Sequence, residues 1–82
     1  MEPKTLSHRI TTVVRDEFDV PRFYISTSYC RDGFSGFDPE WETMVFRYEA
    51  GEVNSDELEQ FRVKSQRQAL INHAWCVERY AM

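Results

Sequence analysis

Two segments of this chain alternate their side chains with the period of two that is typical of a β-strand. Residues 22–30 (RFYISTSYC) and 41–49 (WETMVFRYE) are rich in the aromatic and β-branched residues that favour strands. The residues between them, 31–40, hold two of the three glycines and a proline, so they predict a loop longer than an ordinary hairpin turn. From the second strand we expect Thr43, Val45 and Arg47 to face outward. The side chains expected to face the core are Met44, Phe46 and Tyr48.

The segment before this hairpin has two interpretations. Apolar side chains recur at helical spacing over residues 5–19, at Leu6, Ile10, Val13, Val14 and Phe18. The β-branched run from Ile10 to Val14, however, has low helix propensity and would suit a strand. We expect a helix that ends before Pro21, because the residue preceding a proline is disfavoured in helical conformation.

A helix start is encoded at Ser65. Ser65 and Gln68 form a Ser-x-x-Gln capping box, which satisfies the free amides at the start of a helix. The preceding residues, 56–64, fit either a helix or a strand. The residues expected on the buried face of the C-terminal helix are Ala69, Leu70, His73, Ala74, Val77, Tyr80 and Ala81.

The hexamer Trp41-Glu42-Thr43-Met44-Val45-Phe46 is followed by Ser65, Ala69 and His73 at four-residue intervals. This pattern resembles one that is common among small hypothetical proteins of tailed bacteriophages. In those proteins an aromatic-Glu-Thr-Met-Val-Phe strand precedes a Ser/Thr-capped helix. The resemblance covers residues 23–77 and implies that residues 57–64 form a strand. The resemblance suggests a biological setting, but it implies no particular activity or site residues.

These assignments predict an α+β domain. We expect a small antiparallel sheet of about three strands, a C-terminal helix packed on it and an N-terminal helix, in the order α-β-β-β-α. At 82 residues the chain should form a single domain, 1–82. It has no apolar run long enough to cross a membrane and only two cysteines, and because its first residues lack the apolar region of a signal peptide we expect none. We therefore expect a cytoplasmic protein, in the host cytoplasm if a phage encodes it.

Charge is unevenly distributed along the chain. Residues 38–59 carry eight acidic side chains and one basic side chain, whereas the rest of the chain is slightly basic. The net charge of -4 disfavours direct binding of nucleic acid, because neutralisation of phosphates supplies most of that affinity. The acidic segment should instead contact a basic protein surface, such as one that holds nucleic acid in a host complex.

No pattern in the sequence points to catalysis. His73 could act as a base with Glu42, or bind a metal with Cys76, but zinc needs three or four ligands. We expect His73 to hydrogen-bond a backbone group between helix and sheet. Cys30 and Cys76 are expected to be buried, unreactive thiols. We therefore expect no enzymatic activity, no cofactor and no metal.

Aromatic and charged residues are interleaved in residues 31–41, a composition typical of protein-binding hot spots. These rings could instead cover a small core. We expect a non-enzymatic, phage-type accessory protein, monomeric or homodimeric, that binds a protein and inhibits a host or defence factor, as anti-CRISPR proteins do. The chain could also be a homo-oligomeric assembly component or a small enzyme using His73. The residues expected to bind the partner are Phe34, Phe37, Asp38, Glu40, Trp41, Glu49, Glu52, Asp56 and Glu57.

Overall fold

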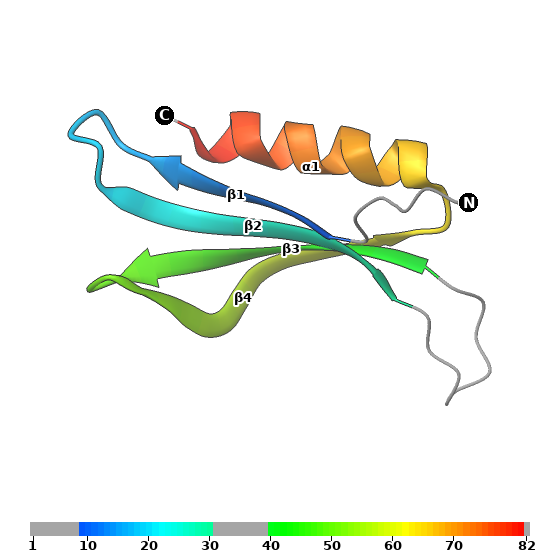
Figure 1. The fold of residues 1–82 in the computed structure, drawn as a ribbon, viewed down its shortest axis with the longest axis horizontal. Coiled ribbons are helices and arrows are strands. Elements are labelled where there is room, and N and C mark those ends of the chain that lie inside the picture. The colour runs from blue at the N-terminus through cyan, green and yellow to red at the C-terminus, as the bar shows by residue number, and fades with distance from the viewer. Residues whose placement is uncertain (1–8, 31–39, 82) are drawn as a thin grey trace, which may run out of the picture.

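The fold is one antiparallel sheet with a helix on one face (Figure 1). The computed structural model describes residues 9–30 and 40–81. In chain order the elements are β1 (Arg9–Arg15), β2 (Pro21–Cys30), β3 (Glu40–Glu49), β4 (Glu52–Val63) and α1 (Gln66–Tyr80). The strands lie in the sheet in the same order, so each is hydrogen-bonded to its neighbours in sequence. No other described element covers the face opposite α1 (Figure 1).

The prediction of an N-terminal helix is wrong, because residues 9–15 form the edge strand β1. The sheet accordingly has four strands rather than about three, in the order ββββα rather than α-β-β-β-α. The β-branched run from Ile10 to Val14 fits a pleated surface better than a helix. β1 is also hydrogen-bonded along its length to β2. This pairing is between distant residues, so the spacing of apolar residues within 5–19 could not indicate it. Residues 5–8 of the predicted helix lie outside the described residues.

Strand β4 starts immediately after a two-residue turn at Ala50-Gly51 and includes the ambiguous segment 56–64 up to Val63. Its register with β3 shifts between Tyr48 and Val45, where β4 holds more residues than β3. The extra residues bow β4 outward (Figure 1). Bulges of this kind protect an exposed sheet edge from pairing with another chain.

The hydrophobic core lies between α1 and the sheet, where Val14, Ile25, Val45 and Cys76 are buried. On β3, Thr43 and Val45 therefore face the helix. The alternation predicted for this strand is confirmed, but its phase is reversed, and the prediction that its largest side chains face the core is wrong. Those side chains, Met44, Phe46 and Tyr48, are half-buried on the face that α1 does not cover.

Ser65 caps α1 as predicted. Its Oγ accepts a hydrogen bond from the backbone N–H of Gln68 at 3.1 Å. The second half of the predicted capping box does not form, since the Gln68 side chain donates forward to the Asn72 Oδ1 at 3.1 Å. One hydroxyl is thus enough to start the helix at this position.

The buried face of α1 is rotated from the predicted one. Ala69, His73 and Cys76 are buried, whereas Leu70 is 43% exposed and Ala74 is also exposed. The small side chain of Ala69 lets the helix approach the sheet closely. The large apolar side chains of Leu70, Ile71 and Trp75 lie on the outer side of the helix.

The β3–β4 turn gives a prediction about stability. Ala50 and Gly51 both have positive φ, +53° and +81°, as in the type I′ hairpin turn that favours Asn-Gly. Because an alanine in this conformation costs about 1–2 kcal/mol, Ala50→Asn should raise the free energy of unfolding by roughly 0.5–1 kcal/mol. Urea denaturation measures the change. Ala50→Val is the control and should destabilise the protein; equal stability of the two variants would contradict the assigned turn.

Candidate functional site

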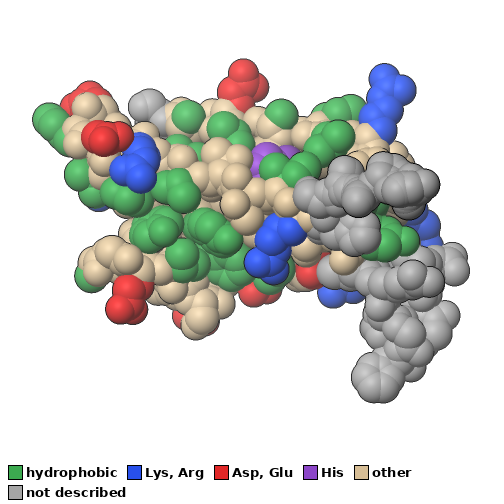
Figure 2. Space-filling view, in the orientation of Figure 1, with side chains coloured by type: hydrophobic (Ala, Val, Ile, Leu, Met, Phe, Trp, Pro, Cys, Tyr) green, Lys and Arg blue, Asp and Glu red, His purple; other side chains and the backbone are tan. Residues whose placement is uncertain are grey.

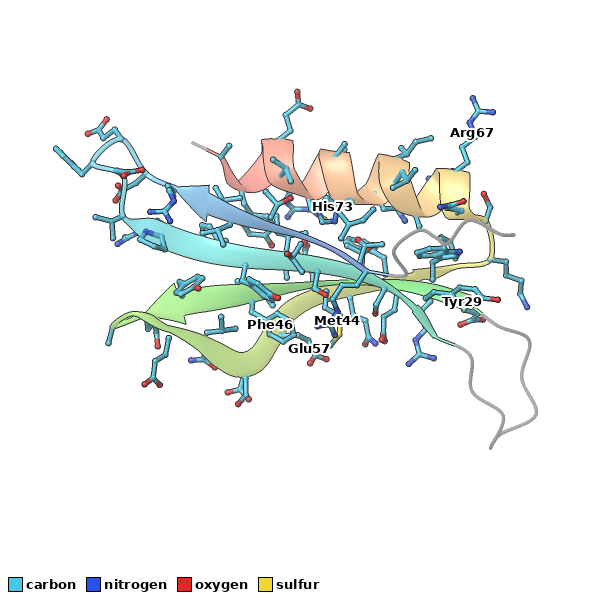
Figure 3. All side chains as sticks on the ribbon, in the orientation of Figure 1. Tyr29, Met44, Phe46, Glu57, Arg67 and His73 are labelled. Carbon is cyan, nitrogen blue, oxygen red and sulfur yellow. The ribbon has the colours of Figure 1, made fainter. Side chains whose placement is uncertain are left out.

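A chain of hydrogen-bonded polar side chains crosses the core beneath α1. His73 Nε2 lies 2.8 Å from the Thr12 Oγ1, and its Nδ1 lies 2.7 Å from the Thr27 Oγ1. The Thr27 Oγ1 is in turn 2.7 Å from that of Thr43. Three strands and the helix are thus linked through one imidazole, which Figure 3 shows between α1 and the sheet.

The surroundings of His73 favour a structural role. Burial lowers the pKa of its imidazole below the ordinary value, so the ring is kept neutral, with one nitrogen to donate and one to accept. The ring bonds hydroxyl groups, not the backbone group that was predicted. Glu42, its proposed catalytic partner, binds Gln60 and Arg62 on the other face of the sheet. The structure therefore does not bring the two residues together.

Cys76 is fully buried beside this chain, on the inner face of α1. Burial raises the pKa of its thiol, and the nearby Glu59 carboxylate raises it further. Because the thiolate is the reactive form of cysteine, this environment makes Cys76 a poor nucleophile. The side chain of Cys30 lies outside the described residues.

The face of the sheet away from α1, called here the open face, carries an aromatic cluster. Its apolar side chains are Val13, Tyr24, Met44, Phe46 and Tyr48. The ring of Tyr24 lies 6.2 Å from that of Phe46 and 6.4 Å from that of Tyr48. Figure 3 shows Met44 and Phe46 on this side of the sheet. The cluster is half-buried and uncovered by any described element.

Four carboxylates, called here the acidic rim, lie on the β3–β4 hairpin near its turn. They are Glu49, Glu52, Asp56 and Glu57. All four are exposed, and none forms an ion pair within the described part of the chain. Glu57 lies directly opposite Phe46 in the sheet register, and both are labelled in Figure 3. Figure 2 shows acidic side chains along the lower margin of this side of the molecule.

At the other end of the same hairpin the acidic residues have cationic partners. Arg62 lies 3.1 Å from the carboxylate of Glu42 and 3.8 Å from that of Glu40. On the helix side, Arg79 lies 3.2 Å from the carboxylate of Glu59. Among the described residues of this segment, 40–59, the acidic side chains outside the acidic rim have cationic partners, so the uncompensated negative charge is concentrated at the rim.

The structure separates the residues that were expected to form one binding surface. Trp41 is only 8% exposed, and its ring packs on that of Tyr29 at 5.1 Å, so it offers little area to a partner. Phe34, Phe37 and Asp38 lie outside the described residues. The acidic rim is instead joined by three rings that were not predicted to belong to a site, those of Tyr24, Phe46 and Tyr48. The sequence shows that these rings alternate with the residues on the other face of the strands. It does not show which of the two faces the helix covers.

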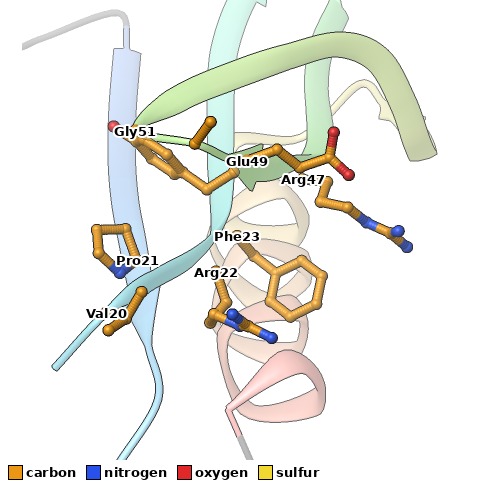
Figure 4. Close-up of a pocket in the computed structure, with 9 residues that line it drawn as sticks. Val20, Pro21, Arg22, Phe23, Arg47, Glu49 and Gly51 are labelled. Carbon is orange, nitrogen blue, oxygen red and sulfur yellow. The ribbon is translucent and has the colours of Figure 1, made fainter. Parts of the chain in front are cut away.

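A groove of about 660 Å³ lies at the end of the sheet, between the β1–β2 and β3–β4 turns (Figure 4). Its walls include Arg22, Arg47, Phe23, Tyr48 and Glu49. Charges of both signs line the groove, and Tyr48 also belongs to the aromatic cluster.

The buried imidazole predicts a pH dependence of stability. Because the pKa of His73 is lowered on folding, the unfolded chain binds a proton more readily. Stability is complete above the ordinary pKa of about 6.5 and falls as the pH decreases below it. Between pH 7 and pH 5.5 we expect a loss of no more than about 1 kcal/mol, a few degrees in Tm.

Thermal unfolding across this range measures the slope. His73→Gln should flatten it, whereas the matched control His8→Gln, at the only other histidine, should keep it. An unchanged slope in His73→Gln would show that another group titrates.

Among the described residues, no group of three or more histidine, cysteine or acidic side chains is placed to hold a metal ion. The one helix of the described chain is too short and too polar to cross a membrane. Comparison of the chain with protein-family models, with curated proteins and with solved structures found no match.

Proposed function

We propose that the protein is a non-enzymatic binding module whose open face docks on a basic surface of a partner protein. One observation carries the proposal. The hairpin that carries an aromatic cluster on an uncovered sheet face also carries, near its turn, four carboxylates that have no cationic partner among the described residues, and one of them, Glu57, lies directly opposite Phe46. Apolar anchors surrounded by a polar rim are the usual composition of a specific protein-binding surface.

The aromatic cluster supplies the area that such a contact needs. Antiparallel sheets with one open face normally place polar side chains on it. Here the central cross-strand pair is Tyr24 and Phe46, with Tyr48 next to them on β3. Aromatic side chains each bury about 150–250 Å² when covered and dominate interface energetics. Covering these three rings would therefore provide a substantial driving force for association.

The acidic rim indicates the chemistry of the partner. Carboxylates steer the encounter with a positively charged surface and disfavour an acidic one. A lysine or arginine placed between the rim and the tyrosines would also gain a cation–π contact with their rings. Rings on a sheet face can stack with bases of single-stranded nucleic acid, but carboxylates beside them repel the phosphates. A basic protein surface is the better match.

The setting of this activity is part of the proposal. The resemblance of residues 23–77 to tailed-phage proteins supports a phage accessory protein that works in the host cytoplasm. Occupying a basic surface that normally holds nucleic acid would inhibit a host or defence protein, as anti-CRISPR proteins do. A role in a homo-oligomeric assembly is the second candidate, and the exposed apolar residues of α1 favour it.

Titration of the isotope-labelled protein, followed by amide chemical shifts, tests the docking face. The probe is a short peptide with lysines around one phenylalanine, at low salt. We expect shifts on β2, β3 and β4 around the open face, and weaker binding as salt rises. Phe46→Ala should raise Kd by about tenfold, and Glu57→Lys should raise it by roughly three- to tenfold.

The matched control is Glu17→Lys, the same charge reversal at an exposed position in the β1–β2 turn, which should leave Kd within about twofold. A glutamate–phenylalanine peptide and single-stranded oligothymidylate are the competing ligands. Tighter binding of either one, or shifts confined to α1, would overturn the proposal.

A further inference from the structure

The outer side of α1 carries an apolar stripe that the rest of the described chain covers only in part, where the ring of Trp75 packs against that of Phe61 and under the guanidinium of Arg79. Leu70, Ile71 and Trp75 are 43%, 50% and 47% exposed, and Ala74 lies among them and is exposed as well. These residues are contiguous over two turns of the helix. Soluble proteins seldom leave such a contiguous patch in water unless it contacts something.

A charged side chain lies at each end of this stripe. Arg67 lies one turn before Ile71, and Glu78 lies one turn after Ala74. The two are about 16 Å apart along the axis at 1.5 Å per residue. Neither forms an ion pair within the described residues, and Figure 3 shows Arg67 pointing away from the sheet.

Both charges oppose the dipole of their own helix. The N-terminal end of a helix carries partial positive charge and the C-terminal end partial negative charge. Arg67 lies in the first turn of α1, and Glu78 lies in its last turn, so each is at the unfavourable end. Beside a second helix that runs in the opposite direction, each of them would lie at the favourable end of its neighbour.

We propose that the outer face of α1 is a homodimer interface, in which two copies of α1 pack antiparallel about a two-fold axis. Positions 67, 71, 74 and 78 have the four-three-four spacing of a helix-pairing seam. An axis through the midpoint of this seam sets Arg67 against Glu78 of the second copy. It also sets the large Ile71 against the small Ala74 of the second copy. Leu70 and Trp75 flank the seam on its two sides.

The self-complementarity of the seam favours a second copy over a different partner. In an isologous interface the seam faces its own sequence in reverse order. Read in reverse, the seam places an acidic residue opposite each basic one and a small residue opposite each large one. A parallel pairing would instead place each charge against its like. An unrelated acidic or basic surface would be repelled by one end of the stripe. The seam spans about three turns, which is small for an interface, so we expect a Kd in the micromolar range.

The dimer does not depend on the proposed function, because the open face lies on the other side of the sheet (Figure 1). Sedimentation equilibrium tests it with the full chain, from about 5 µM to about 500 µM. The mean mass should rise from the 9.8 kDa of one chain towards twice that value. Arg67→Glu and Glu78→Arg should each raise the dimer Kd by about tenfold, because the two-fold axis repeats each repulsion at both ends.

The double variant Arg67→Glu/Glu78→Arg should restore the dimer, since it re-forms both pairs with the charges exchanged. Ile71→Ser should weaken association by about tenfold or more, while Arg47→Glu, the same charge change on β3 rather than on α1, should leave it unchanged. A chain that stays monomeric at the highest concentration would overturn the inference. So would a dimer that survives both Arg67→Glu and Ile71→Ser, or a double variant that fails to restore association.

Discussion

One helix covering one face of a four-stranded sheet is the constraint on which the rest of this structure depends. The 15 residues of α1 make a rod about 22 Å long and 10 Å wide, while four strands about 4.8 Å apart form a wider surface. The helix can therefore exclude water only from the middle of one face, where Val14, Ile25 and Val45 are buried. The opposite face and the outer side of the helix are left to contact water or another molecule.

The rotation of the helix over that face is set by polar contacts. Hydrogen bonds from His73 to Thr12 and Thr27 join α1 to two strands, and the bond from Thr27 to Thr43 extends the chain to a third. Apolar packing alone is non-directional and would tolerate several rotations. A buried hydrogen-bond network is satisfied in only one geometry. Turning His73 inward turns the opposite side of the helix, including Ile71, outward.

Local signals predicted β2, β3 and the start of α1 correctly, but they assigned β1 to a helix and placed the buried faces wrongly. The alternation in residues 22–30 and 41–49 and the cap at Ser65 depend on neighbouring residues, and all three are confirmed. Which of the two alternating sets of β3 side chains is buried depends on the face against which α1 packs. The local sequence of β3 does not contain this information. The aromatic cluster was missed for that reason, since its large rings resemble core. Residues 9–15 became a strand because pairing with β2 outweighs helical spacing.

The open face of the sheet and the outer side of α1 lie on opposite sides of a two-layer molecule, so both can be in contact with other molecules at the same time. Pairing through α1 would bring two copies together back to back and leave both open faces pointing outward. Two acidic, aromatic faces joined rigidly can engage a partner that repeats its basic surface, such as a symmetric or filamentous assembly. Joining two weak contacts in this way raises the overall affinity by orders of magnitude without any new contact. Under these two proposals, a small domain with a thin core would bind tightly through two modest surfaces.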